Sequence, residues 1–134
     1  MLRKYFVLLI LTFVLLGQSV VSKDAFAQQS MQCEFLPTSQ QINDCAVKAY
    51  QIINKKLVSF LAVVRLQLRI QEGEKALFNK AQNLWTQFRD TYCEFAAYRD
   101  KGQEGYIFYK NNCLAQLTTQ RIENLQTYLE NLDF

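Results

Sequence analysis

Residues 38–68, TSQQINDCAVKAYQIINKKLVSFLAVVRLQL, decide the fold. The stretch opens with Thr38 and has Gln41 three residues later, which is a typical capping pair at a helix N-terminus. Behind this pair, apolar residues recur at steps of three and four and so share one helix face. They are Ile42, Ala46, Ala49, Ile53, Leu57, Phe60, Val64 and Leu68. We predict one long helix from Thr38 to about Gln71, with Gly73 as its left-handed C-terminal residue.

Two further segments show the same periodicity. In the second segment we expect a buried face made of Leu77, Ala81, Leu84, Phe88, Tyr92 or Cys93, and Phe95, widened by Trp85 and Ala96. The third segment runs from near Tyr106 through Leu114, Leu117, Ile122, Leu125, Leu129 and Leu132, with the period interrupted at Arg121. Four glycines and one proline are too few for the many turns of a β-sandwich or barrel. The sequence therefore predicts an all-α fold of three long helices in an antiparallel bundle.

The first 27 residues have the pattern of a secretory signal. Arg3 and Lys4 precede an apolar run over residues 5–16, and Ala25 and Ala27 are small residues at the positions that a signal peptidase reads. We predict cleavage after Ala27, a periplasmic or secreted location, and a single mature domain of residues 28–134.

Two other fates of the N-terminal segment remain open. A retained membrane anchor is disfavoured because the apolar run stops short of the about 20 residues that span a bilayer. A lipid anchor on Cys33 is disfavoured because Met31 and Gln32 precede it, where a small residue is needed. We expect no membrane span after cleavage.

Removal of residues 1–27 changes the charge balance. The full chain has 15 basic and 12 acidic residues, a net charge of +3, and the segment holds three of the basic residues and one acidic residue. The remainder therefore has a net charge of about +1, with basic and acidic residues interleaved as on solvated helix faces. Without a concentrated basic stripe, we expect no nucleic-acid partner.

The chain contains no histidine, which excludes Ser-His-Asp and Cys-His catalysis and His-containing zinc sites. An enzyme based on carboxylates is the least favoured function, because no acidic pair stands out from the charged helix faces. We expect no catalytic residue, no metal and no cofactor.

Four cysteines, Cys33, Cys45, Cys93 and Cys113, lie after the predicted cleavage site. An even number of cysteines in an exported chain indicates two disulfides, and three connectivities are open. We favour Cys33 with Cys45 and Cys93 with Cys113, because each bridge then joins a loop to a helix end.

A second group of residues, Trp85, Phe88, Arg89 and Asp90, is followed downstream by Arg121. Trp85 and Arg89 are spaced i, i+4, so the guanidinium can lie on the indole while its donors reach another helix. We expect Asp90 to pair with Arg121 and the group to fix the helix register; a binding role is the alternative. Asn43 is expected to cap or bridge.

These residues form part of longer patterns. The first pattern is Thr38, Asn43, Cys45-Ala46 and Tyr50. The second is Ala81-Gln82-x-x-Trp85-x-x-Phe88-Arg89-Asp90-x-x-Cys93, followed by Cys113-Leu114-x-x-Leu117-Thr118-x-x-Arg121-x-x-x-Leu125. Together with the export signal they resemble the LprI-type lysozyme-inhibitor domain over Cys33 to Leu125. The resemblance implies a helical, disulfide-bonded envelope protein that takes a protein partner, and at least one relative inhibits lysozyme.

Aromatic and basic residues surround the glycine-containing loop that a Cys93–Cys113 bridge closes. Aromatic residues on a constrained loop are typical binding anchors. In a lysozyme inhibitor, a basic or tyrosine side chain of this loop would meet the paired carboxylates of the glycosidase cleft. The alternative is that the rings only cap the bundle. The candidate binding residues are Tyr98, Arg99, Lys101, Tyr106, Phe108 and Tyr109.

Two classes of function remain open. The first is binding and inhibition of lysozyme or of an endogenous muramidase. The second is a structural or accessory envelope protein that docks a partner without inhibiting an enzyme.

Overall fold

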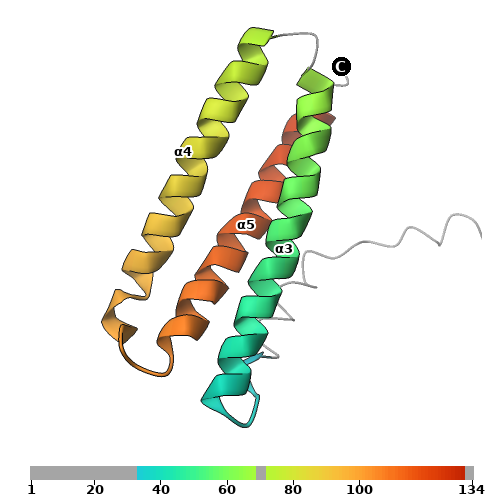
Figure 1. Ribbon diagram of the computed structural model, residues 1–134. Coiled ribbons are helices and arrows are strands. Elements are labelled where there is room, and N and C mark those ends of the chain that lie inside the picture. The colour runs from blue at the N-terminus through green and yellow to red at the C-terminus, as the bar shows by residue number, and fades with distance from the viewer. Residues whose placement is uncertain (1–32, 69–71, 132–134) are drawn as a thin grey trace, which may run out of the picture.

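A computed structural model describes residues 33–68 and 72–131, so the predicted signal segment of residues 1–27 lies outside the described part. Three long helices, α3 (Ser39–Gln67), α4 (Glu72–Ala96) and α5 (Tyr106–Glu130), follow one another, with the short helix η2 (Tyr98–Asp100) between α4 and α5. Consecutive helices run in opposite directions (Figure 1). The predicted three-helix, all-α bundle is confirmed, with α3 and α5 parallel to each other.

The ends of α3 show one correct and one wrong prediction. The Thr38 hydroxyl accepts a hydrogen bond from the Gln41 backbone N–H at 3.2 Å, so the predicted N-cap is confirmed. At the other end, Leu68 caps the helix and donates its N–H to the carbonyls of Leu66 and Val64. Gly73, predicted as the left-handed residue after α3, instead lies in the first turn of α4. Because Leu68 already closes the last turn of α3, a left-handed glycine is not needed.

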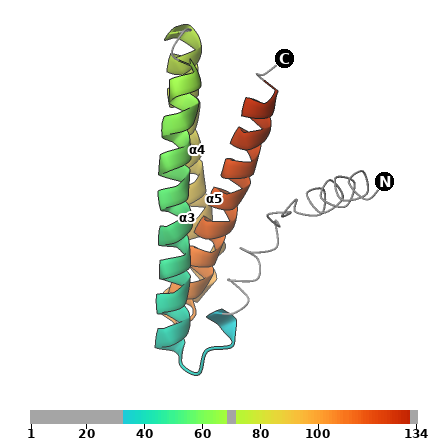
Figure 2. The ribbon, with the colours of Figure 1, turned by 90° about the vertical axis from the view of Figure 1, so that its right-hand side faces the viewer.

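The apolar core lies mainly between α3 and α5, whose mutual contacts are the most extensive in the bundle. Small Ala115 and buried Ile122 on α5 face Leu57, Leu61 and Val64 on α3. The periodicity predicted Phe60 on the buried face. Leu61 is buried instead, and Phe60 packs half-buried against the core. Figure 2 shows α3 and α5 running in the same direction and diverging toward their upper ends, with the connection from α4 to α5 at the lower end. The third long helix, α4, packs mainly against α5.

The orientation of α4 reverses the prediction. Gln82, Arg89 and Cys93 are buried, whereas Leu77, Leu84, Phe88, Tyr92 and Phe95 are exposed. The cause is the bridge from Cys93 to Cys113 on α5, which turns Cys93 inward. Residues four, seven and eleven positions earlier share that face of a helix and are therefore turned inward as well. Most of the apolar residues that we predicted as the buried face therefore lie on the outside. The exceptions are Cys93, the buried alternative to Tyr92, and Trp85, which packs half-buried against the core.

Both predicted disulfides are present and lie toward the same end of the bundle. Cys33–Cys45 ties the segment before α3 to the second turn of that helix, and Cys93–Cys113 joins α4 to α5. None of the helices in residues 33–68 and 72–131 has the length and hydropathy that crossing a bilayer requires.

Replacement of Cys93 and Cys113 with serine tests how much this disulfide contributes to the stability of the bundle. The bridge spans a sequence separation of 20, and a cross-link of this size stabilises a fold by about 3 kcal/mol. We expect the double variant to lose roughly that free energy of unfolding, measured by urea denaturation. An unchanged urea midpoint would contradict this account.

Candidate functional site

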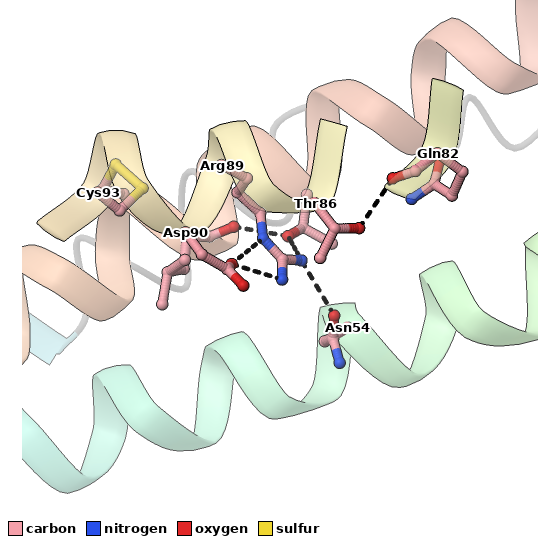
Figure 3. A network of polar contacts seen from close by, with 9 residues as sticks. Asn54, Gln82, Thr86, Arg89, Asp90 and Cys93 are labelled. Atoms are coloured by element: carbon pink, nitrogen blue, oxygen red, sulfur yellow. Dashed lines mark hydrogen bonds and ion pairs between the residues drawn. A yellow bond between two sulfur atoms is a disulfide. The ribbon is translucent and has the colours of Figure 1, made fainter. Parts of the chain in front are cut away.

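The first candidate site is the buried Arg89 on α4. Its Nη1 donates to Asn54 Oδ1 of α3 at 3.2 Å and to Thr118 Oγ1 of α5 at 3.1 Å. Its Nε and Nη2 lie 2.8 Å from Asp90 Oδ1 on the same helix. Figure 3 shows the guanidinium between α4 and α3, with Asn54 below it. One side chain therefore binds groups from all three helices.

Aromatic rings complete the environment of this cation. The guanidinium carbon of Arg89 lies 5.1 Å from the centre of the Trp85 ring and 5.4 Å from that of Tyr50, so the predicted stacking on Trp85 is confirmed. Burial raises the pKa of Tyr50, while the nearby positive charge of Arg89 acts in the opposite direction. The arrangement neutralises a buried charge by stacking and hydrogen bonding.

The prediction of an ion pair between Asp90 and Arg121 is wrong. Asp90 is engaged by Arg89, whereas Arg121 Nε donates to Gln82 Oε1 at 3.0 Å and its guanidinium lies 5.6 Å from the Trp85 ring. Arg121 sits on the part of α5 that faces the N-terminal half of α4, one turn away from Thr118. It therefore meets Gln82 rather than Asp90, and Trp85 lies between two guanidinium groups.

Replacement of Arg89 by alanine tests this network. The change leaves Asn54 and Thr118 without their donor, so we expect a loss of about 3 kcal/mol in the free energy of unfolding. Asp90→Asn is the comparison, and it should cost less than about 1 kcal/mol because that carboxylate is half exposed. Urea denaturation followed by circular dichroism measures both. Equal effects of the two variants would refute the central role of Arg89.

The second candidate site is the end of the bundle that carries η2 and both disulfides. Glu94 lies at its centre, because its carboxylate accepts a hydrogen bond from the Tyr106 hydroxyl at 2.7 Å and another from Lys110 Nζ. Lys101 Nζ lies 3.5 Å from the same carboxylate. The hydrogen bond from Lys110 is the main cause that lowers the pKa of Glu94 from 4.5 to about 2. The same bond raises the pKa of Lys110.

The connection between η2 and α5 is also bound to α3. Ser39 Oγ donates to Glu104 Oε2 at 2.5 Å, and Asn43 Nδ2 donates to the Glu104 carbonyl at 2.9 Å. The expectation that Asn43 bridges is confirmed. Within the turn, Gly102 adopts a φ of +85°, which a residue with a Cβ rarely adopts. Hydrogen bonds to α3 and α4 therefore fix both sides of this connection.

The six predicted binding residues divide into two sets. Phe108 is not available to a partner, because it packs in a buried cluster with Cys33 and Ala46. Tyr106 is half-buried and its hydroxyl is bound to Glu94. The other four of the six predicted residues stay exposed, and we call them the loop surface. They are Tyr98, Arg99, Lys101 and Tyr109.

A shallow pocket lies beside the loop surface, and Tyr109 lines its rim. Its walls come from the start of α3 and the start of α5, and they include Ser39, Asn43 and Glu104. Sequence reasoning missed Glu94, Glu104 and Lys110. The cysteine spacing contained a signal for Glu94 and Lys110. Glu94 adjoins Cys93 and Lys110 precedes Cys113 by three residues, so the Cys93–Cys113 bridge brings the two charged residues together.

The lowered pKa of Glu94 gives a prediction on pH. A carboxylate with a depressed folded-state pKa contributes stability above its unfolded pKa, near 4.5, and loses that contribution as the pH falls toward about 2. We expect the urea midpoint of the unaltered protein to fall more steeply than that of Glu94→Gln over this window, and the two curves to converge at its acid end.

Glu130→Gln is the control for this experiment, because Glu130 is an exposed carboxylate in the last turn of α5. Its curve should follow that of the unaltered protein. Curves for Glu94→Gln and the unaltered protein that stay parallel from pH 7 to 2 would show that the contacts of Glu94 contribute nothing.

Two comparisons show proteins to which this chain is similar. The sequence model of the family described as "Lysozyme inhibitor LprI" matches residues 33–125. A protein of Rhizobium meliloti (strain 1021), described as "Uncharacterized protein R02472", is 26% identical over 117 residues, which cover 79% of this chain and 84% of that protein. No solved structure gives a significant match.

Proposed function

Because the chain belongs to the LprI lysozyme inhibitor family, we propose that it is an exported protein whose loop surface binds and inhibits a lysozyme or an endogenous muramidase. The observation that carries the proposal is the exposure of Tyr98, Arg99, Lys101 and Tyr109 on a connection that is fixed on both sides. The proposed role is inhibition of an enzyme and not catalysis by this chain.

Rigidity of the loop surface supports binding. The Cys93–Cys113 bridge spans the connection, Glu104 ties it to α3, and Glu94 of α4 pairs with Lys101 of the connection. A surface that is already ordered loses little conformational entropy when a partner binds. Exposed tyrosines on such a surface supply large contact area from side chains with few rotatable bonds.

The charges of the loop surface fit the proposed target. Glycoside hydrolases hold two carboxylates in their cleft, and a basic group inserted there gains attraction from both. Arg99 is exposed, and Lys101 lies 5.7 Å from the centre of the Tyr98 ring, so a cation and an aromatic ring project together. We propose that Arg99 or Lys101 approaches the catalytic carboxylates while Tyr98 and Tyr109 pack on the cleft wall.

Export is part of the proposal. The signal pattern in residues 1–27 and the two disulfides support an oxidising destination, the periplasm or the medium. A mature chain of residues 28–134 would then carry the whole helical domain.

A lysozyme clearing assay tests the function. The oxidised protein, produced from the full chain, is added to lysozymes of several types and to muramidases from the same envelope. We expect inhibition by the unaltered protein and at least a tenfold weaker effect for the double variant Tyr98→Ala, Tyr109→Ala. The matched control, Val63→Ala with Leu66→Ala, removes two exposed apolar side chains from the far end of α3 and should inhibit normally.

The possible outcomes separate the two classes of function. Lack of inhibition at large molar excess across all the enzymes would overturn the inhibitor proposal. Binding to a muramidase without loss of its activity would instead support an accessory envelope protein. Equal losses in the loop and control variants would exclude the loop surface as the contact.

A further inference from the structure

The outward face of α4 carries a row of large apolar side chains, which we call the outer stripe. Its members, Leu77, Leu84, Phe88, Tyr92 and Phe95, are between 46% and 75% exposed. With about 200 Å² for a whole side chain of this size, the outer stripe presents roughly 600 Å² of surface. The largest apolar patch on a typical monomer covers about 300–600 Å², so this one lies at the upper limit.

The outer stripe has the spacing of a helix-pairing seam. The outward positions 77, 81, 84, 88, 91 and 95 are separated by alternating steps of four and three residues, which is the a and d pattern of a coiled coil. The buried Gln82, Arg89 and Cys93 lie on the opposite side of α4. The seam therefore takes no part in the packing of α4 within the bundle. Phe88, Tyr92 and Phe95 line a shallow groove along it.

We propose that two copies of the chain associate through the outer stripe, with their α4 helices antiparallel. In this arrangement a positions of one helix meet d positions of the other. Phe88 then packs on Leu84 of the second copy, and Phe95 packs on Leu77, so that each of these layers combines a ring with a leucine. Ala81 meets Thr91 between them. The seam is thus complementary to itself when one helix is reversed.

The exposed area of the outer stripe supports a second copy of the chain as its binding partner. A standard stable interface buries about 800 Å² on each partner. The outer stripe supplies about three quarters of that area, and the exposed Ala81, Gln87 and Thr91 flank it. Burial of the five side chains in both copies covers about 1,200 Å² in total, which is the lower limit of a stable interface.

Charge symmetry supports the same arrangement. Lys80 and Glu94 flank the seam on one side, and each is seven residues from Gln87. In an antiparallel pair, flanking positions of this kind face each other across the seam. Lys80 of each copy then faces Glu94 of the other, whose carboxylate also accepts hydrogen bonds from Tyr106 and Lys110 of its own chain. Gln87 of one copy faces Gln87 of the other at the centre.

Sedimentation equilibrium on the oxidised protein, produced from the full chain, tests the proposal. We expect a dimer at concentrations of tens of micromolar, and at least a 100-fold weaker association for Phe88→Asp, which places two carboxylates in the centre of the seam. Val63→Asp, at an exposed apolar position on α3, is the matched control and should dimerise normally. Circular dichroism establishes that both variants remain folded.

A cysteine at position 87 tests the direction of pairing. Gln87→Cys should form a disulfide-linked dimer on mild oxidation, whereas Asn83→Cys, which is exposed on the same helix but away from the seam, should remain unlinked. A monomer at every concentration would overturn the proposal, as would a dimer that Phe88→Asp leaves intact. A dimer that Gln87→Cys fails to cross-link would overturn the antiparallel arrangement.

Discussion

The guanidinium of Arg89 occupies a position that apolar side chains fill in most helical bundles. A buried cation is costly unless stacking rings and acceptors surround it. Asn54, Thr118 and Asp90 supply the acceptors, and Trp85 and Tyr50 supply the rings. Because these partners come from all three helices, α4 satisfies Arg89 in only one register and one rotation. The packing of α4 on the α3–α5 pair depends on this polar arrangement more than on apolar contact.

A polar inner face has a direct effect on the rest of α4. The inner positions are taken by Gln82, Arg89 and Cys93, so most of the large apolar residues of the helix lie on the opposite side, while Phe78 and Trp85 pack half-buried against the core. A helix that is held by hydrogen bonds, stacking and a disulfide can thus expose an apolar seam without loss of its place in the bundle. If two copies pair through that seam in the antiparallel sense, their loop surfaces point in opposite directions, and one dimer can engage two enzyme molecules.

The sequence predicted the number, order and direction of the helices, because periodicity, the Thr38 cap and the glycine-containing turn are local signals. It also predicted the stacking of Arg89 on Trp85 and both disulfides. It failed for the rotation of α4, since periodicity shows which residues share a face and not which face is buried. Cys93 carried the missing information, because the bridge to Cys113 fixes the inward side. Phe108 was misassigned because its neighbours in the fold, Cys33 and Ala46, are distant in sequence. Asp90 was misassigned because the adjacent Arg89, and not a residue of another helix, binds its carboxylate.

The two ends of the bundle are held by different kinds of bond. Both disulfides, and the hydrogen bonds of Glu94 and Glu104, lie toward the end that carries η2. At the opposite end, α4 is attached by hydrogen bonds from Arg65 to Asn79 and from Tyr128 to Glu74. Local opening of the backbone therefore costs less free energy there, and amide hydrogens in the first turns of α4 exchange with solvent sooner than those near Cys93. We therefore expect the helices to open from the far end while the loop surface keeps its shape.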